Sequence, residues 1–231
     1  MLTLEGLDVV QGEFRLGADL RVKTGEITAV IGPSGGGKST LLNCIAGFMP
    51  PAAGRVIWDG VEITKLMPGE RPISMIFQDN NLFPHMSAFD NVGLGARPSL
   101  RLNTEERNRV SAALKRVGLG NLADRKPAAL SGGQQSRVAL ARVLVRDKPL
   151  LLLDEPFAAL GPALKDEMLD LVAELAGDSG ATVLMVTHEP ADAVRIAGET
   201  IYVEGGVVAR PAATRALMEE PPEGLRAYLG R

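Results

Sequence analysis

The stretch GPSGGGKST at residues 32 to 40 fits the pattern G-x-x-x-x-G-K-[ST]. A β-branched run at residues 27 to 31 precedes it, and residues 40 to 46 after it have helical character. Glycine lets a backbone fold tightly around an anion, so that N–H groups and the helix N-terminus face phosphate oxygens. The sequence therefore predicts a strand, a phosphate-binding loop and a helix. The predicted phosphate-binding residues are Gly32, Pro33, Ser34, Gly35, Gly36, Gly37, Lys38, Ser39 and Thr40.

Two side chains of this loop carry chemistry. We expect Lys38 to reach the β- and γ-phosphates of a nucleotide, and Ser39 to offer its hydroxyl to Mg²⁺. A glycine-rich turn before a helix is the plainer alternative, so the motif needs support from the rest of the chain.

A second predicted strand ends in two carboxylates. Residues 150 to 153 are four leucines, too few to span a bilayer and typical of a strand buried on both faces of a parallel sheet. Asp154 and Glu155 follow at the strand end, where open α/β sheets bind ligands. We expect Asp154 to hold Mg²⁺ through its water shell and Glu155 to polarise the water that attacks the γ-phosphate. A surface acidic pair is usually solvated charge, but four leucines would be unusual neighbours for a surface loop.

Residues 130 to 134 read LSGGQ. Ser131 is a good helix N-cap and Gln134 stands three positions later, which predicts a capping box at the start of a helix. A helix N-terminus that exposes Ser131, Gly132 and Gly133 is also an anion site, and nothing within one chain needs a second one.

With these motifs in this order, the chain resembles the ATP-binding subunits of ATP-binding cassette (ABC) transporters over nearly its whole length. The resemblance implies an α/β fold: a P-loop nucleoside triphosphatase core with a mixed sheet, an amino-terminal antiparallel β subdomain and a helical subdomain. It implies ATP and Mg²⁺ as cofactors. It also implies a head-to-tail homodimer, in which Ser131, Gly132, Gly133 and Gln134 of each copy face the γ-phosphate held by Lys38 of the other. Hydrolysis would then require a dimer.

Two further positions match the family. Gln78, after the apolar run at residues 73 to 77, resembles the glutamine that touches Mg²⁺ and the attacking water and relays the nucleotide state to the membrane partner. His188, after the mainly apolar residues 183 to 187, resembles the switch histidine that contacts the γ-phosphate. A lone histidine is more often structural or solvated, but the neighbouring motifs favour the functional role. The expected catalytic residues are Glu155, His188 and Gln78, and the expected metal ligands are Ser39, Gln78 and Asp154.

Two positions depart from the family pattern. Gly161 stands where the family usually has an aspartate that orders a loop across the dimer interface, so we expect looser closure and weaker communication between sites. The family commonly stacks an aromatic residue on adenine, and Gln11 falls at that place here. Phe14 is the nearest aromatic residue, and we expect it to be a core residue of a strand at residues 14 to 22. Stacking of order 1 kcal/mol would then be missing.

The organisation expected is one cassette, residues 1–231. Residues 1–78 and 148–231 would form the core and the β subdomain, and residues 79–147, which lose strand character, would form a helical lobe. Helices are expected at residues 104 to 117 and 133 to 145. A final hairpin is expected to turn through Gly205 and Gly206.

Composition narrows the class of protein. A net charge of −3 gives no general attraction to nucleic acid, and 45% hydrophobic residues support a full core. No apolar run approaches the ~20 residues that cross a bilayer, and no signal segment is seen at the start. A single cysteine, Cys44, suits a reducing compartment. Together with the resemblance to transporter subunits, this composition implies a peripheral protein at the cytoplasmic face of the bacterial inner membrane.

The segment at residues 80 to 95 follows Gln78 and combines apolar residues with few charges. A groove lined by Leu82, Phe83, Met86 and Phe89 would accept a short helix of a transmembrane permease. Packing between the helical lobe and the sheet would account for the same residues equally well, so both interpretations stay open.

A narrower resemblance suggests the transported solute. The stretch FQDNNLF at residues 77 to 83, with residues 93 to 95 and 100 to 103, is similar to the ATP-binding subunits of thiamine importers. This implies an ATP-hydrolysing importer subunit, with permease subunits and, indirectly, a periplasmic solute-binding protein as partners. The alternatives are a polyamine, iron(III) or molybdate importer and a non-transport ABC ATPase. Against the last, the sequence has no long coiled-coil insertion, no duplicated cassette and no basic stripe.

Overall fold

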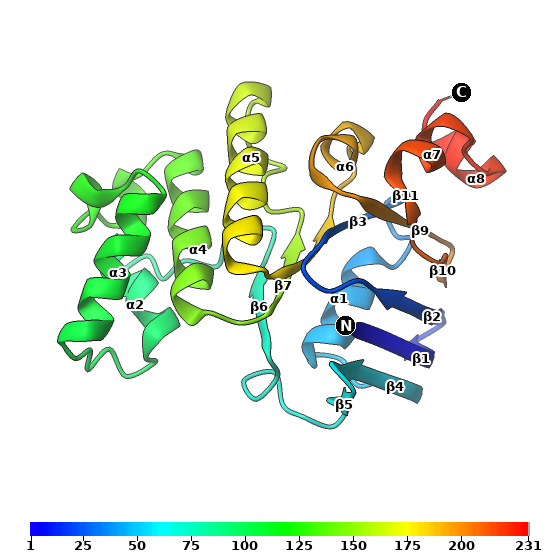
Figure 1. Ribbon diagram of the computed structural model, residues 1–231, viewed down its shortest axis with the longest axis horizontal. Coiled ribbons are helices and arrows are strands. Elements are labelled where there is room, and N and C mark those ends of the chain that lie inside the picture. The colour runs from blue at the N-terminus through cyan, green and yellow to red at the C-terminus, as the bar shows by residue number, and fades with distance from the viewer. Residues whose placement is uncertain (231) are drawn as a thin grey trace.

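One curled mixed sheet runs through the molecule (Figure 1), and the computed structural model describes residues 1–230. The strands are β1 (Leu2–Gln11), β2 (Phe14–Val22), β3 (Ile27–Ile31), β4 (Ala53–Trp58), β5 (Val61–Glu62), β6 (Ile73–Ile76), β7 (Leu150–Asp154), β8 (Thr182–Val186), β9 (Glu199–Glu204), β10 (Val207–Val208) and β11 (Ala212–Ala213). Their order across the sheet is β5-β4-β1-β2-β10-β9-β3-β8-β7-β6, and β11 pairs with β9.

Helices cover both faces of this sheet. They are α1 (Lys38–Ala46), α2 (Ala88–Ala96), α3 (Thr104–Arg116), α4 (Gly132–Arg146), α5 (Pro162–Ser179), α6 (Pro190–Ile196), α7 (Thr214–Glu219) and α8 (Glu223–Tyr228), with 3-10 turns at Gly120–Leu122 and Pro127–Ala129. The mixed α/β architecture expected from the sequence is confirmed.

The parallel strands β6, β7, β8, β3 and β9 form one half of the sheet, with β6 at its edge. Leu150 and Leu152 of β7 pack in the cluster that contains α1, whereas Leu151 and Leu153 pack with α5 on the other face. Successive residues of a strand face opposite sides, so a strand between two layers of helices must be apolar throughout. The four leucines are buried for this reason, and the expected strand is confirmed.

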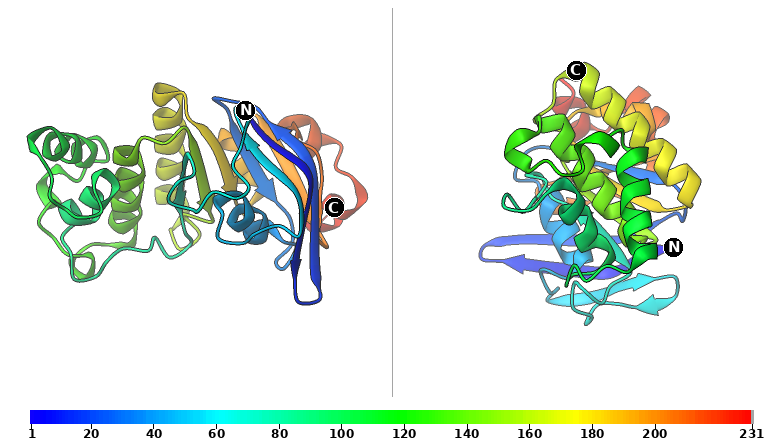
Figure 2. Two further views of the ribbon diagram at one scale, coloured as in Figure 1. Left: turned by 90° about the horizontal axis from the view of Figure 1, so that it is seen from below. Right: turned by 90° about the vertical axis from the view of Figure 1, so that its left-hand side faces the viewer.

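The antiparallel strands β1, β2, β4 and β5 form the other part of the sheet. Their inward residues, such as Leu4 and Leu16, share one cluster with Leu41 and Ile45 of α1. The sheet therefore curls around α1 and buries the helix that follows the phosphate loop. Figure 2 shows the β1–β2 hairpin and the carboxyl-terminal helices at one end of the molecule and α2 and α3 at the other.

The helices α2, α3 and α4 share a separate apolar cluster, which includes Val92, Val110 and Val138. Within the described chain no strand lies between Ile76 and Leu150. We therefore propose residues 79–147 as the helical lobe. The helix α4 joins this lobe to the sheet, because its Leu140 packs in the cluster of β7 and α5.

The helix α2 was not among the expected elements. Glycines at positions 93 and 95 weaken the helical pattern in the sequence. A Cβ on Gly95 would lie 2.3 Å from the Arg142 carbonyl oxygen, so this glycine lets α2 approach α4 closely. Ser87 caps the helix by accepting a hydrogen bond from the Asp90 N–H. Among residues 1–230, no helix combines the length and apolar character needed to cross a membrane.

Candidate nucleotide site

The phosphate loop connects β3 to α1, which begins at Lys38, two positions before residue 40. Gly32 has φ of 148°, and a Cβ there would lie 1.9 Å from the Val203 carbonyl oxygen. Gly37 has φ of 110° at the N-cap, and a Cβ there would meet Leu16 at 2.6 Å. Only glycine fits such conformations beside these neighbours. The predicted strand, loop and helix are confirmed as a backbone arrangement.

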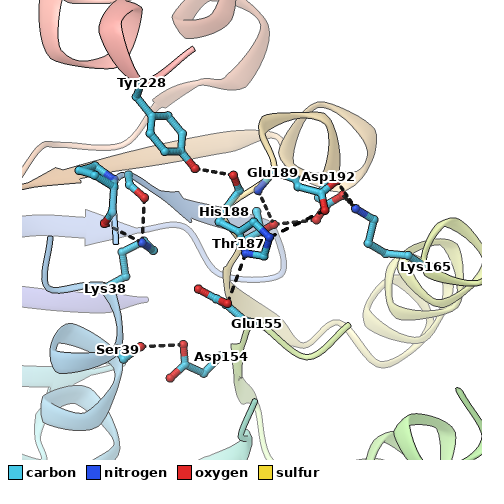
Figure 3. Close-up of polar contacts among 12 residues, drawn as sticks. Lys38, Ser39, Asp154, Glu155, Lys165, Thr187, His188, Glu189, Asp192 and Tyr228 are labelled. Carbon is cyan, nitrogen blue, oxygen red and sulfur yellow. Dashed lines mark hydrogen bonds and ion pairs between the residues drawn. The ribbon is translucent and has the colours of Figure 1, made fainter. Parts of the chain in front are cut away.

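Lys38 lies buried inside this loop. Its ammonium donates hydrogen bonds to the carbonyl oxygens of Gly32 at 2.8 Å and Pro33 at 2.9 Å (Figure 3). Burial lowers the pKa of Lys38, while the negative charges of Glu155 and Asp154 oppose this shift. A buried ammonium that is held by neutral carbonyls favours an anionic ligand, because such a ligand would offset the desolvation of the charge.

Ser39 and Asp154 come together from α1 and β7. The Ser39 hydroxyl donates to Asp154 Oδ1 at 3.1 Å. Burial raises the pKa of Asp154, although the Ser39 hydrogen bond acts in the opposite direction. Mg²⁺ usually takes one or two protein oxygens and fills its remaining positions with water and phosphate, so this pair suits it. The described residues contain no cluster of three or more His, Cys, Asp or Glu side chains that would hold a metal by themselves.

Glu155 and His188 follow β7 and β8, and Figure 3 shows their side chains pointing toward each other. Glu155 Oε2 lies 3.3 Å from His188 Nδ1. The backbone turns sharply at Glu155, where φ is 46°, while its N–H still donates to the Val186 carbonyl at 3.1 Å. A non-glycine residue in this region is strained, and such strain gathers at functional sites. The turn brings the carboxylate to the cavity beside the phosphate loop, which Lys38 also lines.

A cavity of about 460 Å³ opens beside the phosphate loop. Its lining comes from β1, β2, the loop, α1 and the ends of β6 and β7. The lining residues are Gln11, Phe14, Ser34, Gly35, Gly37, Lys38, Ser39, Thr40, Gln78 and Glu155. The structure therefore brings Gln78 and Glu155 to the predicted phosphate loop, from positions far apart in the sequence.

Both residues considered for the nucleotide base line this cavity. Gln11 is exposed at the end of β1, and Phe14 is half-buried at the start of β2. Phe14 also packs against the core around α1. The expectation that Phe14 is a core residue is therefore incomplete, because one part of its ring reaches the cavity.

The LSGGQ turn lies at the start of α4. The capping box is confirmed: the Gln134 N–H donates to Ser131 Oγ at 3.3 Å, and the Ser131 N–H donates to Gln134 Oε1 at 3.0 Å. The expectation that Gly133 is exposed was wrong, since a Cβ there would lie 2.3 Å from Leu164 of α5. Ser131 and Gly132 are exposed. None of these four residues is among those that line the described cavity.

Gly161 is the N-cap of α5 and accepts no side-chain capping bond. A Cβ at this position would meet nothing within 4 Å. Its φ of −66° and ψ of 156° suit any residue. The fold therefore does not require glycine at position 161. The departure from the family pattern removes a carboxylate, and an aspartate would fit here.

The segment after Gln78 is divided between packing and surface. Leu82 and Phe89 are half-buried and pack against the clusters of the helices, which favours the packing interpretation for these two residues. Phe83 is 44% exposed and lines a separate cavity of about 220 Å³. Met86 is half-buried. Arg142 of α4 holds this segment by donating to the carbonyls of residues 80 and 81 at 2.8 and 2.9 Å.

Arg71 is a residue that sequence reasoning missed. It is 1% exposed and donates hydrogen bonds to the carbonyls of Cys44 and Ile45 in the last turn of α1, at 3.0 and 2.6 Å, and to two loop carbonyls, of Leu66 and Thr64. A cation is favourable at a helix C-terminus, so Arg71 fixes the far end of the helix that begins at Lys38. No motif marks it in the sequence, where an arginine in a polar loop would be expected in solvent.

Known proteins share this arrangement. The family model described as "ABC transporter" matches residues 16–158. The thiamine import ATP-binding protein ThiQ of Cereibacter sphaeroides is 59% identical over 230 residues, covering 100% of both chains. The solved dimeric ATP-binding cassette MJ0796, in a post-hydrolysis state with ADP and Pi, has a TM-score of 0.81 and 34% identity over 93% of this chain and 99% of that one. The cbiO1 subunit of Clostridium perfringens, part of the ABC transporter complex cbiONQ, has a TM-score of 0.85 and 31% identity, covering 99% and 94% of the two chains. The chain belongs to the ABC transporter family, as one of its ATP-binding cassettes.

Proposed function

We propose that this chain is the ATP-hydrolysing subunit of an ABC importer that takes up thiamine. Thiamine is proposed as the solute because the chain is 59% identical to a thiamine import ATP-binding protein along the whole length of both chains. The chemistry rests on the geometry: Lys38, Ser39, Gln78 and Glu155 surround one cavity, with Asp154 and His188 beside it.

The residues divide the work on the nucleotide. The backbone of residues 32 to 40 and the Lys38 ammonium bind the phosphates, while Ser39, Asp154 and Gln78 would hold Mg²⁺, which neutralises phosphate charge when bound. Glu155 accepts a proton from the attacking water. His188 donates a hydrogen bond to the γ-phosphate through the ring nitrogen that does not face Glu155.

The complete site needs two copies of the chain. Ser131 and Gly132 present a capped helix N-terminus to solvent, away from the residues that line the cavity of the same chain. In a head-to-tail dimer each such turn would face the γ-phosphate in the other copy. The dimeric solved cassette with ADP and Pi supports this arrangement.

The cavity beside Phe83 is the permease docking site in this proposal. This cavity lies where the segment after Gln78 meets α4. Gln78 lines the nucleotide cavity, so a change at the nucleotide would pass along the chain from Gln78 to this segment. A short permease helix would bury the exposed ring of Phe83. The chain then works at the cytoplasmic face of the inner membrane, bound to permease subunits and served by a periplasmic solute-binding protein.

Deletion of the gene for this chain in its own host tests the proposal. Uptake of radiolabelled thiamine should fall to background, and wild-type protein should restore it, whereas the Lys38→Ala protein should not. Uptake of polyamine, iron(III) and molybdate serves as the control and should stay unchanged. Normal thiamine uptake with loss of one of the other solutes would replace thiamine by that solute.

A further inference from the structure

The carboxyl-terminal helices pack on the frame that carries the phosphate loop. Leu225 of α8 is fully buried in a cluster with Ala29 and Ile31 of β3 and Ala193 of α6. Val30, between these two β3 residues, faces the cluster of α1. The tail therefore lies on the face of β3 opposite α1. Both β3 and α6 lead to the site, since β3 ends at the phosphate loop and α6 begins two residues after His188.

At the end of α8 a tyrosine hydroxyl reaches the histidine loop. Tyr228 donates a hydrogen bond to the backbone carbonyl of His188, as the close-up in Figure 3 shows. Burial and the nearby charges of Glu155 and Glu189 raise the pKa of Tyr228, so the hydroxyl keeps its proton and remains a donor. The bond fixes the backbone carbonyl of His188, and the side chain of this residue lies beside Glu155.

Other contacts hold the residues on either side of His188. The Thr187 hydroxyl donates to Asp192 at 2.6 Å and accepts a hydrogen bond from the Glu189 N–H at 3.1 Å. Lys165 of α5 forms ion pairs with Glu189 and with Asp192. These contacts fasten the neighbours of His188 to α5 and α6. Tyr228 contacts His188 itself, and it belongs to α8 and not to α5 or α6.

We propose that Tyr228 is a positioning residue for ATP hydrolysis. Its hydroxyl orients the His188 peptide and, through it, the imidazole between Glu155 and the γ-phosphate. The inference rests on the proposed role of His188 at the γ-phosphate. It gives the carboxyl-terminal tail a part in the chemical step, beyond covering β3 and β9.

Steady-state kinetics of the full-length chain test this with a matched pair of variants. Tyr228→Phe removes the hydroxyl and keeps the ring, while Leu225 still anchors the tail. The control is Tyr202→Phe, at the other of the two tyrosines, which lies in the same apolar cluster. A misplaced hydrogen-bonded group should lower kcat about three- to tenfold with the KM for ATP changed less than about twofold in Tyr228→Phe. Tyr202→Phe should keep wild-type values.

The histidine NMR spectrum provides a readout that general destabilisation would not move. The chain has two histidines, His85 and His188, so the His188 ring signals can be assigned by their loss in His188→Ala. The His188 signals should shift or broaden in Tyr228→Phe and stay in place in Tyr202→Phe, while the His85 signals stay in place in both.

A lower kcat together with a moved His188 signal supports the inference, and any other combination for Tyr228→Phe overturns it. Wild-type turnover by His188→Ala would instead remove the proposed role of His188 itself. Loss of turnover in His188→Ala with normal Tyr228→Phe would leave that role intact and refute the part of Tyr228 alone.

Discussion

Glu155 Oε2 and His188 Nδ1 lie 3.3 Å apart across the ends of β7 and β8. The two residues are separated by 33 positions in the sequence, and parallel pairing of Asp154 with Val186 brings them together. The carboxylate and the imidazole therefore meet at the carboxyl ends of these strands, and Glu155 also lines the cavity beside the phosphate loop. The proposed mechanism of hydrolysis depends on this pair, with Glu155 as the group that activates water and His188 as the group that contacts the phosphate.

Replacing the Glu155 carboxylate by an amide should separate binding from chemistry. Glu155→Gln keeps the size of the side chain and loses the base, so hydrolysis should fall by about a hundredfold or more while ATP binding persists. Size-exclusion chromatography with ATP should then show a stable dimer. Lys38→Ala, which loses phosphate binding, should stay monomeric under the same conditions. Rapid hydrolysis by Glu155→Gln would refute the assignment of the base.

A carboxylate at position 161 should tighten communication between the two sites. The N-cap of α5 has open space for a side chain, so Gly161→Asp is sterically tolerated and can cap the helix, adding a few tenths of a kcal/mol to stability. We expect a higher ATPase rate and a steeper dependence on ATP concentration. Gly161→Ala, which adds a side chain without charge, is the control. Equal rates and equal cooperativity for the Asp variant and wild type would contradict the idea.

Two phenylalanines in the segment after Gln78 should behave differently. Phe83→Ala removes an exposed ring from the cavity, so transport should be uncoupled while ATPase activity of the isolated dimer is kept. Phe89→Ala removes a ring that packs in the helical cluster and lies 5.0 Å from the Arg107 guanidinium, so it should lower the free energy of unfolding by about 2–3 kcal/mol.

Thermal unfolding and uptake assays on the same two proteins check this pair. An unfolding temperature for Phe83→Ala as low as that of Phe89→Ala would mean that Phe83 is a packing residue. Normal transport by a stable Phe83→Ala protein would also exclude the docking role.

Cys44 should resist thiol reagents until the protein unfolds. The residue is fully buried in the core around α1, and burial raises its pKa to about 11. At pH 8 about one thiol in a thousand would be ionised, and the thiolate is the reactive form. The raised pKa also implies a stability contribution that is full below pH 9 and is lost as the pH rises toward 11. Labelling with a maleimide at pH 8, with and without denaturant, measures the difference. Fast labelling of the folded chain would show that α1 opens.

The sequence predicted those parts of the fold that depend on local pattern. The phosphate loop, the capping box at Ser131 and the buried strand before Asp154 each follow from residue types at fixed spacing. The meeting of Gln78 and Glu155 in one cavity needed the topology of the family as well, because sheet order cannot be derived from spacing.

The contacts that were missed are long-range and carry no motif. Tyr228 lies 40 positions from His188, and Arg71 lies 27 positions from Cys44. The sequence pattern predicts an exposed turn at Gly133, whereas the burial of this residue depends on how α5 packs against α4. Such contacts follow from tertiary packing, which periodicity and composition do not encode at the level of single residues.

Mixing two inactive proteins tests the central claim most directly. Lys38→Ala has a defective phosphate loop and an intact LSGGQ turn, and Ser131→Arg has the reverse. Each protein alone should show background ATPase activity. Each mixed dimer holds one complete site, formed by the intact phosphate loop of Ser131→Arg and the intact turn of Lys38→Ala, so activity should reappear in an equal mixture. If the two proteins pair at random, half of the dimers are mixed and activity should reach about a quarter of the wild-type value. No recovery from two folded proteins that form mixed dimers, or full activity of Ser131→Arg alone, would contradict a site shared between two copies of the chain.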